Sequence, residues 1–247
     1  MKHVGRVCEI TRYPVKSMAG IPAESAYLGW YGIAGDRRFA FRRTDDTSSF
    51  PFLSASRLPA LILYRPLGLH DSLGEPVPTQ VRTPAGACFE LRSRELAAEL
   101  TERFGSAVEL MNLRHGIFDE AAISVITLGT IAGIGREVGS DLDRRRFRAN
   151  IVLDTVRTEP FLEDAWVGQM LMLGDGDAPP TVSIVMRDER CMMVNLDPET
   201  AKQDGRIMKT VVRLNENNAG VYATVIRSGT IRVGDPVYLA SELLATR

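Results

Sequence analysis

The stretch VYATVIRSGTIRVGDPVYL, residues 221 to 239, holds two runs rich in Val, Ile and Tyr on either side of a Ser-Gly turn signal. Runs of this composition, bounded by Gly, Pro and Asp, are typical of β-strands. Seven similar runs occur upstream: VGRVCEI, RFAFRR, ALILYRP, TQVRT, ACFELR, RANIVLD and TVSIVMR. Within TQVRTPAGACFELR (79–92), Pro-Ala-Gly between two alternating runs indicates a hairpin. The sequence therefore predicts a mainly β fold.

Two segments have helical patterns instead. Leu96, Leu100 and Phe104 recur every four residues, and Ser93 precedes them as an N-cap. The second segment, LGTIAGIGREVG, starts at Leu128 and has Thr127 in the capping position, although its glycines lower its helix propensity. We therefore expect an α+β chain with few helices.

Length and composition are those of a globular protein of one large or two ordinary domains. The chain has 247 residues, 45% of them hydrophobic and 25% charged, and a formal net charge of -1. This charge gives no global attraction to nucleic acid or an anionic membrane, so we expect neither as a partner. The segment 112–122, NLRHGIFDEAA, reads as a connector, which predicts one domain over 1–111 and another over 112–247.

The three cysteines, Cys8, Cys88 and Cys191, are far apart and form no C-x-x-C pair. This usage points away from a disulfide framework and toward a reducing cytoplasm. The chain also has no signal-type apolar region and no run of about 18 apolar residues. We therefore expect a cytoplasmic, soluble protein.

Cys191 stands out in RDERCMMVNLDPET (187–200), where it follows a charged run. The neighbouring Arg190 favours a thiolate, which is the form that attacks electrophiles or binds soft metals. The alternative is a half-buried strand cysteine with no chemical role, because free cysteines are often buried. The local sequence leaves both interpretations open.

Three other stretches carry basic residues that suit an anionic ligand. YPVKSMAG (13–20) places Lys16 and Ser17 in a loop bounded by Pro and Gly, where an ammonium, a hydroxyl and backbone N–H groups can meet a phosphate. GDRRF (35–39) adds Arg37 at a turn. The alternative interpretation of YPVKSMAG is an ordinary solvated loop, and that of GDRRF is a surface turn.

The third stretch, DRRRFRAN (143–150), has four arginines in six residues. On a strand beginning near Phe147, Arg148 and Asn150 share one face, which suits a planar anionic ligand. We expect the remaining three arginines, 144–146, to form a solvated rim. The sequence has no G-x-G-x-x-G or Walker pattern and no H-E-x-x-H motif. It therefore gives no support to a nucleotide-binding protein or to a zinc metalloprotease.

Taken in order, these stretches resemble the pattern of MOSC (molybdenum cofactor sulfurase C-terminal) domain proteins with an N-terminal β-barrel partner. The N-terminal part of the resemblance lies in YPVKSMAG, GDRRFAF and FLSASRLPAL. The C-terminal part lies in ISVITLGTIAGIG, RRFRANIVLD, PFLEDAWVGQ, RCMMVNLDPET and GVYATVIRSGTIRVGDPVYL. The layout is most similar to that of the amidoxime-reducing components and their bacterial counterparts. The resemblance implies a β-rich α+β fold in which an N-terminal β-barrel-like domain packs on a MOSC β-barrel domain.

The resemblance also implies a cofactor and the residues that hold it. The cofactor would be Mo-molybdopterin, the molybdenum cofactor, with Cys191 as the thiolate on the metal and the catalytic residue. The cofactor-binding residues would be Lys16, Ser17 and Arg37 on the phosphate and pterin side, Thr127, Arg148 and Asn150 on the opposite side, Arg190 beside the thiolate, and Tyr222 closing the pocket. Two stretches depart from the family pattern. Asp188 and Glu189 stand where many relatives have Cys or Ser. FLSASR also differs from the family pattern, so no role is carried over to Ser54 or Arg57.

The implied activity is that of an oxidoreductase that reduces N-hydroxylated substrates such as amidoximes and N-oxides. Its electrons would come from a separate ferredoxin- or cytochrome-type protein, and no pyridoxal phosphate domain accompanies it. Two alternatives remain open: sulfur transfer or cofactor maturation with Cys191 as a persulfide carrier, and a cofactor-binding module without turnover.

Overall fold

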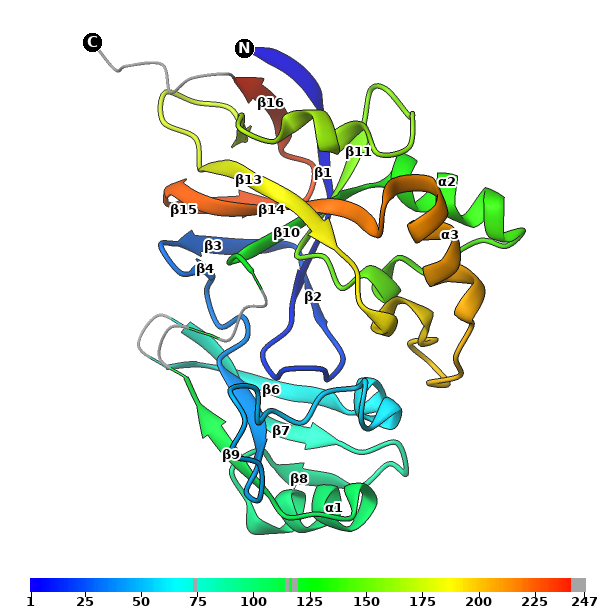
Figure 1. The fold of residues 1–247 in the computed structure, drawn as a ribbon. Coiled ribbons are helices and arrows are strands. Elements are labelled where there is room, and N and C mark those ends of the chain that lie inside the picture. The colour runs from blue at the N-terminus through cyan, green and yellow to red at the C-terminus, as the bar shows by residue number, and fades with distance from the viewer. Residues whose placement is uncertain (73–74, 114–115, 117–119, 241–247) are drawn as a thin grey trace.

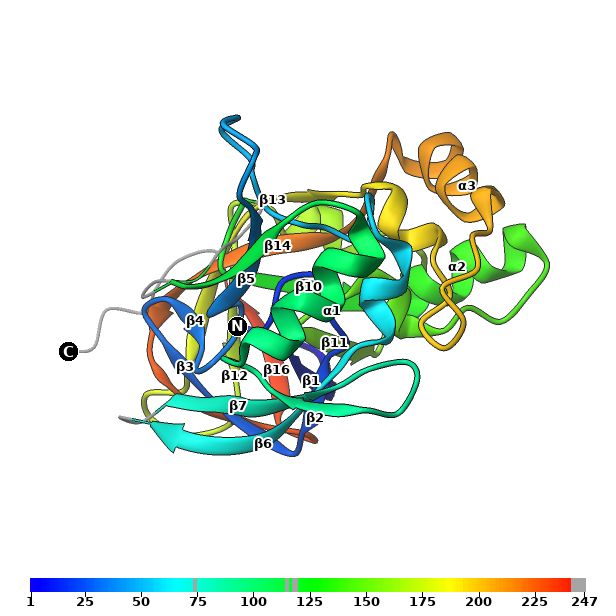
Figure 2. The same cartoon turned by 90° about the horizontal axis from the view of Figure 1, so that it is seen from below.

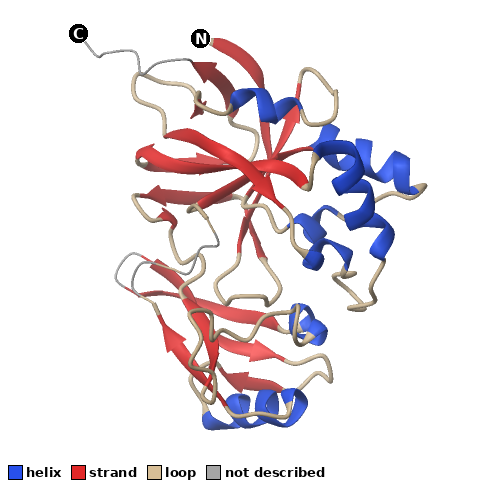
Figure 3. Cartoon of the chain, in the orientation of Figure 1, coloured by secondary structure: helices blue, strands red, loops and turns tan. Residues whose placement is uncertain are grey.

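The computed structural model describes residues 1–72, 75–113, 116 and 120–240. Strands dominate this part of the chain, and the few helices lie on its outside (Figure 3). No helix in the described ranges is long and apolar enough to cross a membrane. The fold class expected from the sequence, β-rich α+β, is confirmed.

The larger part of the molecule is a barrel closed by seven strands. These strands, together with one short strand that extends their sheet, are β1 (Lys2–Arg12), β2 (Ile21–Ala23), β10 (Ile123–Thr127), β11 (Ile151–Thr155), β12 (Met170–Leu173), β13 (Thr181–Glu189), β14 (Asn218–Arg227) and β16 (Pro236–Ala240). The order around the barrel is β11-β10-β14-β13-β12-β16-β1, and β1 pairs back onto β11. β10 and β11 pair in parallel, whereas the other pairings in this sheet are antiparallel. Closure leaves the seven strands without an exposed edge.

Gly5 is the residue at which the barrel closes. It pairs with Thr155 of β11 on one side and with Val237 of β16 on the other, next to a register shift in β1. A Cβ atom at this position would lie 2.2 Å from the carbonyl oxygen of Asp154. Only glycine allows the two backbones to approach this closely.

The barrel is filled by apolar side chains from all around it. Val7, Val125, Leu171 and Val221 are members of one buried cluster, and each is at most 1% exposed. A separate small sheet packs against the barrel and consists of β15 (Gly229–Arg232), β3 (Ser25–Gly29) and β4 (Gly32–Ile33). Its Leu28, Ile33 and Ile231 belong to the same cluster.

The smaller part, drawn below the barrel in Figure 1, has its own apolar core. Its elements are β5 (Phe39–Arg43), the 3-10 helix η1 (Pro59–Leu63), β6 (Arg65–Ser72), β7 (Glu75–Arg82), β8 (Cys88–Glu90), α1 (Arg94–Phe104) and β9 (Val108–Asn112). β5 pairs with β9, and β6, β7 and β8 form a meander. The hairpin expected around Pro-Ala-Gly and the helix capped by Ser93 are both confirmed.

Two further helices cover one flank of the barrel. They are α2 (Leu128–Val138), which begins after its N-cap Thr127 as expected, and α3 (Gly205–Asn215), which the sequence analysis missed. The two helices lie side by side in both views (Figures 1 and 2). Their buried residues share a cluster with Phe147 and Val152 on the outer face of the barrel. Three 3-10 helices complete this part of the chain: η2 (Arg144–Phe147), η3 (Leu162–Trp166) and η4 (Met192–Asn195).

The sheets divide the chain differently from the expected domains 1–111 and 112–247. β1 and β3 pair with strands of the second half, and β2 and β4 extend these pairings, so the chain starts in the barrel, builds the smaller part and then returns. The connector expected over 112–122 lies partly outside the described residues. The boundary at residue 112 stays a prediction.

Candidate functional site

Cys191 lies just after the end of β13, as the N-cap residue of η4, and its side chain is exposed. Exposure alternates over the preceding residues: Asp188 and Arg190 are buried, whereas Glu189 and Cys191 are exposed. Because side chains of an extended segment point alternately to its two faces, this pattern presents the thiol outward. The interpretation as a half-buried strand cysteine is therefore wrong.

Arg190 anchors the backbone that carries the thiol. Its Nε donates to the carbonyl oxygen of Ala219 at 2.6 Å, and its Nη1 donates to that of Phe147 at 2.6 Å. Its Nη2 lies 2.8 Å from a carboxylate oxygen of Asp188, which also accepts a hydrogen bond from Ser124 Oγ at 2.6 Å. The charge of Arg190 is thus balanced by a buried carboxylate, and the guanidinium joins three segments of the chain.

Lys16 and Ser17 lie in the loop between β1 and β2, which is inserted into the smaller part. The amide of Lys16 donates to Phe39 O at 2.8 Å, and the amide of Ala19 donates to Tyr64 O at 2.9 Å. Ser17 adopts a positive φ of 65° and is 4% exposed. The ammonium of Lys16 lies 5.2 Å from the ring centroid of Phe50. The barrel and the smaller part together therefore set the position of this loop.

Arg37 is held by two partners that are themselves fully buried. Its Nη1 donates to Asp36 Oδ2 at 2.6 Å and to Asn150 Oδ1 at 3.0 Å. Asn150 Oδ1 also accepts from the amide of Ser124 at 3.2 Å, and its Nδ2 donates to Thr11 O at 3.2 Å. Asn150 does not line the cavity described below, but it bonds Arg37 and Ser124, which do.

Arg148 does not lie on a strand, contrary to the expectation that one begins near Phe147. Residues 144–147 form η2, Arg148 caps it at a φ of 51°, and β11 begins only at Ile151. The run forms a tight turn instead, capped at its start by the Asp143 side chain, which accepts a hydrogen bond from the amide of Arg145. The Arg148 guanidinium donates to Met18 O at 2.7 Å and stacks 4.3 Å from the Tyr13 ring centroid.

Seven of the nine residues expected at the site line one cavity of about 440 Å³ between the barrel and the smaller part. They are Lys16, Ser17, Arg37, Arg148, Arg190, Cys191 and Tyr222. Basic side chains from three separate segments thus share a cavity with an exposed thiol. Tyr222 reaches it from β14, where it pairs with Ser124 of β10.

Thr127 is not brought to this cavity. It is fully buried, and its hydroxyl lies 2.9 Å from Glu163 Oε2, which also accepts from Thr130 Oγ1 at 2.8 Å. Burial raises the pKa of the Glu163 carboxyl above its ordinary value of 4.5. The hydrogen bonds among Thr127, Thr130 and Glu163 fix the start of α2, where Thr127 is the N-cap. The expected contact of Thr127 with the cofactor stays a prediction.

Several residues that line the cavity were given no role from the sequence. Ser124, Asp188 and Glu189 come from β10 and β13, and Phe50 and Ser54 come from the smaller part. The stretch FLSASR was singled out, but its departure from the family pattern gave no reason to assign Ser54 a role. Phe50 had no sequence signal, because its place depends on the packing of the loop after β5.

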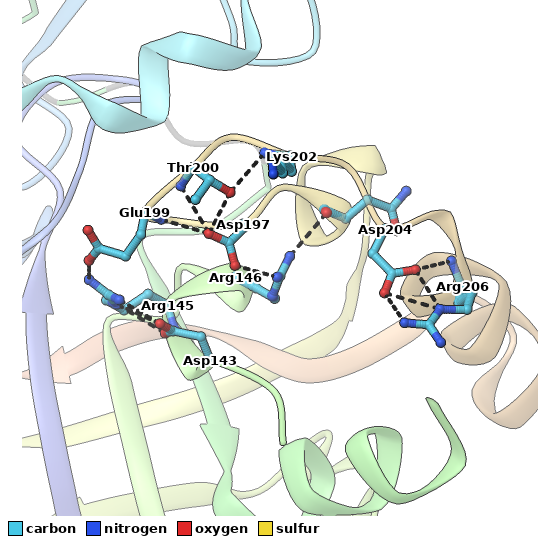
Figure 4. A network of polar contacts seen from close by, with 10 residues as sticks. Asp143, Arg145, Arg146, Asp197, Glu199, Thr200, Lys202, Asp204 and Arg206 are labelled. Atoms are coloured by element: carbon cyan, nitrogen blue, oxygen red, sulfur yellow. Dashed lines mark hydrogen bonds and ion pairs between the residues drawn. The ribbon is translucent and has the colours of Figure 1, made fainter. Parts of the chain in front are cut away.

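The expected solvated rim of arginines is only partly right. The side chains of Arg144 and Arg145 are 41% and 50% exposed, but that of Arg146 is 11% exposed. Arg146 donates to Asn195 O at 3.0 Å and pairs with Asp197 at 2.8 Å, in the segment that follows Cys191 (Figure 4). Arg146 also lines the cavity.

The network in Figure 4 stabilises the segment after Cys191. Arg145 bridges Asp143 and Glu199, and Asp197 Oδ1 accepts from the amides of Glu199 and Thr200 at 3.1 and 3.0 Å. Arginine–carboxylate pairs with several hydrogen bonds hold their geometry well. The arginine run and the DPET segment therefore form one rigid border of the site.

Comparisons with known proteins agree with this architecture. The MOSC domain family model matches residues 112–238, just over half of the chain. Human mitochondrial amidoxime-reducing component 1 is 22% identical over 98% of this chain and 85% of its own length. Human mitochondrial amidoxime reducing component 2 is 26% identical over 96% of this chain and 84% of its own length.

Among solved structures, the YuaD protein from Bacillus subtilis has a similar fold. It aligns over 97% of this chain and 96% of its own, with a TM-score of 0.51 and 14% sequence identity. At this identity the likeness concerns the fold alone. The fold expected from the sequence resemblance, a barrel with a second β-rich part, is confirmed.

Proposed function

Because the chain belongs to the MOSC domain family, we propose that it is a molybdenum-cofactor-dependent reductase of N-hydroxylated compounds. The two human relatives named above are amidoxime-reducing components, which supports this choice among the activities that a MOSC domain can host. The electrons come from a separate protein of the ferredoxin or cytochrome type.

One observation carries the proposal: an exposed cysteine thiol and a set of basic side chains line the same cavity. Cys191 comes from the end of β13, whereas Lys16, Arg37 and Arg148 come from three other segments. A cavity of about 440 Å³ lies within the roughly 300–1,000 Å³ that small-molecule sites occupy.

The donor groups suit a molybdenum cofactor. A thiolate is a soft ligand and suits a metal that also has sulfur ligands. Guanidinium and ammonium groups form charge-assisted hydrogen bonds to a phosphate. Ser17 adds a hydroxyl next to Lys16. The residues present therefore fit the group that the family implies.

The roles of the chain's own residues follow from their geometry. Cys191 provides its Sγ, as a thiolate, for the metal. Lys16 and Arg148 hold the phosphate and pterin, and Arg37 does so in an orientation set by Asp36 and Asn150. Arg190 keeps the cysteine backbone in place through its bonds to Phe147 and Ala219. Tyr222 closes the wall of the cavity.

When bound, the cofactor supplies the two-electron redox chemistry. In the overall reaction an N–O bond breaks, the substrate nitrogen takes up two electrons and one proton, and the released hydroxyl leaves as water with a second proton. The electron pair originates from the separate donor protein.

The test is an assay on protein purified from a host that makes the cofactor. Molybdenum is measured per chain, and benzamidoxime reduction is followed by the appearance of benzamidine, first with NADH alone and then with reduced methyl viologen. We expect about one molybdenum per chain, turnover with the viologen and none with NADH. Full molybdenum loading without turnover with either donor would contradict the proposed reductase activity.

The exposed thiol also suits the alternative of sulfur transfer or cofactor maturation. A persulfide carrier needs an accessible cysteine, and Cys191 is accessible. Mass spectrometry of the purified chain separates the two functions. A persulfide on Cys191 in protein without molybdenum would favour sulfur transfer.

A further inference from the structure

Tyr13 is a buried aromatic residue at the start of the loop between β1 and β2, which also carries Lys16. It is 3% exposed and does not line the cavity of about 440 Å³ proposed to hold the cofactor, here called the cofactor cavity. The guanidinium carbon of Arg148 lies 4.3 Å from its ring centroid, and that of Arg37 lies 5.8 Å from it. Two basic side chains of the cofactor cavity therefore meet the same ring.

The backbone of Tyr13 is joined to Arg37 as well. Its amide donates a hydrogen bond to Asp36 Oδ1 at 2.5 Å, and its carbonyl oxygen accepts one from the amide of Arg37 at 2.8 Å. Asp36 is fully buried, and its Oδ2 accepts from Arg37 Nη1 at 2.6 Å. A single carboxylate thus bridges the backbone of Tyr13 and the side chain of Arg37, so the ring and the guanidinium share one support.

Arg148 reaches the ring from the second half of the sequence. It follows η2 at a positive φ of 51°, and its Nη1 donates to Met18 O at 2.7 Å. Met18 and Tyr13 belong to the same loop, and both are buried. The loop therefore holds the Arg148 side chain at two points, one a carbonyl oxygen and the other an aromatic ring.

Contacts of this kind orient a cation without cancelling its charge. A guanidinium within about 6 Å of a ring centroid is attracted by the ring quadrupole, and the attraction is stronger where water is excluded. Burial raises the pKa of the Tyr13 hydroxyl above its ordinary value of 10.0, so the phenol stays neutral. Arginine side chains have many rotamers, and ordering them before a ligand arrives reduces the entropy that binding costs. A neutral ring is therefore suited to hold arginines that must still bind an anion.

From these contacts we propose that Tyr13 is a positioning residue of the cofactor cavity: its ring holds Arg37 and Arg148 in the orientation in which they bind an anion, the phosphate of the cofactor. This role rests on the proposed function, because the ligand it concerns is the molybdenum cofactor. Tyr13 itself does not line the cavity and acts through the two arginines. Removing the attraction of the ring should therefore weaken retention of the cofactor without changing the residues that line the cavity.

The experiment changes the electrons of the ring while keeping its shape. Tyr13→Phe keeps the attraction to a cation, whereas pentafluorophenylalanine, incorporated biosynthetically at position 13, reverses the ring quadrupole. Tyr13→Leu removes the ring altogether. Each full chain is purified from a host that makes the cofactor, and the loss of molybdenum over time is measured after gel filtration. Circular dichroism and thermal unfolding check that each chain is folded.

We expect Tyr13→Phe to lose molybdenum within about twofold of the wild-type rate, and Tyr13→Leu and the pentafluorophenylalanine chain to lose it at least about tenfold faster. The matched control is Tyr238→Leu, the same change at a tyrosine of β16 that does not line the cofactor cavity, and it should keep the wild-type rate. In an Arg148→Ala background, Tyr13→Leu should raise the rate by a clearly smaller factor, because one of its two partners is already missing.

A measurement without the cofactor separates the role of Tyr13 from the proposed function. Inorganic phosphate is titrated calorimetrically into the full chain from a host that does not make the cofactor, and Tyr13→Leu should weaken its binding by at least about threefold. If the chain from the first host holds no molybdenum but phosphate binding still depends on the ring, the proposed cofactor is wrong and the role of Tyr13 stands.

Three outcomes would overturn the role of Tyr13. One is equal loss of molybdenum from the wild type and from the folded chain with pentafluorophenylalanine. Another is the same factor for Tyr13→Leu with and without Arg148→Ala, which would indicate a general effect on the fold. The third is a folded wild-type chain that binds neither phosphate nor molybdenum.

Discussion

Arg37 and Asn150 are joined by a hydrogen bond of 3.0 Å between Nη1 and Oδ1, although they are 113 residues apart in the sequence. Asn150 is completely buried and comes just before β11, whereas Arg37 comes just before β5 of the smaller part. The bond therefore connects the two parts of the molecule at the cavity. Asn150, which does not line the cavity, therefore orients Arg37, which is expected to hold the cofactor.

Asn150→Ala should consequently weaken cofactor binding at the proposed site, although Asn150 does not line the cavity. The change removes the acceptor for Arg37 and for the Ser124 amide, and a buried donor left unpaired costs about 1–3 kcal/mol. We expect a lower unfolding temperature and a lower molybdenum content, both measured on protein from the same host. Asn112→Ala is the control, because Asn112 is exposed at the end of β9 and does not line the cavity. Unchanged molybdenum content in Asn150→Ala would argue against an orienting role.

Lys16→Ala and Arg148→Ala should each reduce cofactor retention directly. A charge-assisted hydrogen bond to a phosphate is worth about 1.5–3 kcal/mol, which corresponds to roughly one to two decades of affinity. The measurement is molybdenum remaining per chain after gel filtration. Lys209→Ala, at an exposed position of α3, removes a charge that does not line the cavity and should retain the cofactor. Equal loss in all three variants would indicate a general effect of net charge.

The helices α1 and α2 and the hairpin were predictable because their signals are local. Ser93 caps α1 through a hydrogen bond to the amide of Leu96, three residues away, and the Pro-Ala-Gly turn fixes β7 against β8. Closure of the barrel was not predictable in this way. It depends on β1 pairing with β11 about 150 residues later, which no local pattern encodes. α3 was missed because its stretch, GRIMKTVVRLN, contains β-branched residues that favour strands.

The site was predictable to the extent that family motifs mark it. Those motifs pointed to nine site residues, seven of which meet in one cavity, among them Cys191, Tyr222 and four basic residues. One error arose where a side chain's direction depends on a turn. Arg148 was placed on a strand because its sequence alternates, but the 3-10 turn before it rotates the chain. Thr127, whose cofactor contact stays a prediction, lies at a helix start, and its direction depends on Glu163, a partner 36 residues away.

Cys191→Ala should abolish metal-dependent activity and leave the fold intact. The side chain is exposed, so its truncation should change the free energy of unfolding by no more than about 0.5 kcal/mol. Cys8→Ala and Cys88→Ala are the matched controls and should keep the activity, because neither residue lines the cofactor cavity. Activity of benzamidoxime reduction is compared at equal protein concentration. Equal activity in all three variants would exclude Cys191 as the ligand.

Glu163 should make the stability of the barrel depend on pH. Burial raises the pKa of its carboxyl in the folded chain above the ordinary value of 4.5, so the folded state binds more protons than the unfolded state in the interval above that value. Stability from this group is therefore fully present below about pH 4.5 and decreases as the pH rises through the folded pKa. Glu163→Gln removes the titration while keeping an acceptor oxygen for Thr127 and Thr130.

The measurement for Glu163 is chemical denaturation of both proteins between about pH 4 and pH 8. The difference in unfolding free energy, wild type minus Glu163→Gln, should fall as the pH increases. Glu102→Gln, at an exposed position of α1, should show no comparable trend. A difference that is constant across this interval would mean that the pKa of the carboxyl is the same in the folded and the unfolded chain.

Gly5→Ala should destabilise the whole barrel, because Gly5 lies at its point of closure. The added Cβ would stand 2.2 Å from Asp154 O and 2.7 Å from Thr155 Cα, both of them backbone atoms that cannot rotate away. Relief requires β1 to separate from β11, so we expect a loss of about 1–3 kcal/mol or more and an unfolding temperature lower by roughly 3–10 °C. Gly205→Ala is the matched control, since no atom lies within 4 Å of its added Cβ and alanine favours the first turn of α3. Thermal unfolding should therefore show a clear decrease for Gly5→Ala and none for Gly205→Ala, whereas equal unfolding temperatures would mean that the strands can separate at this point without cost.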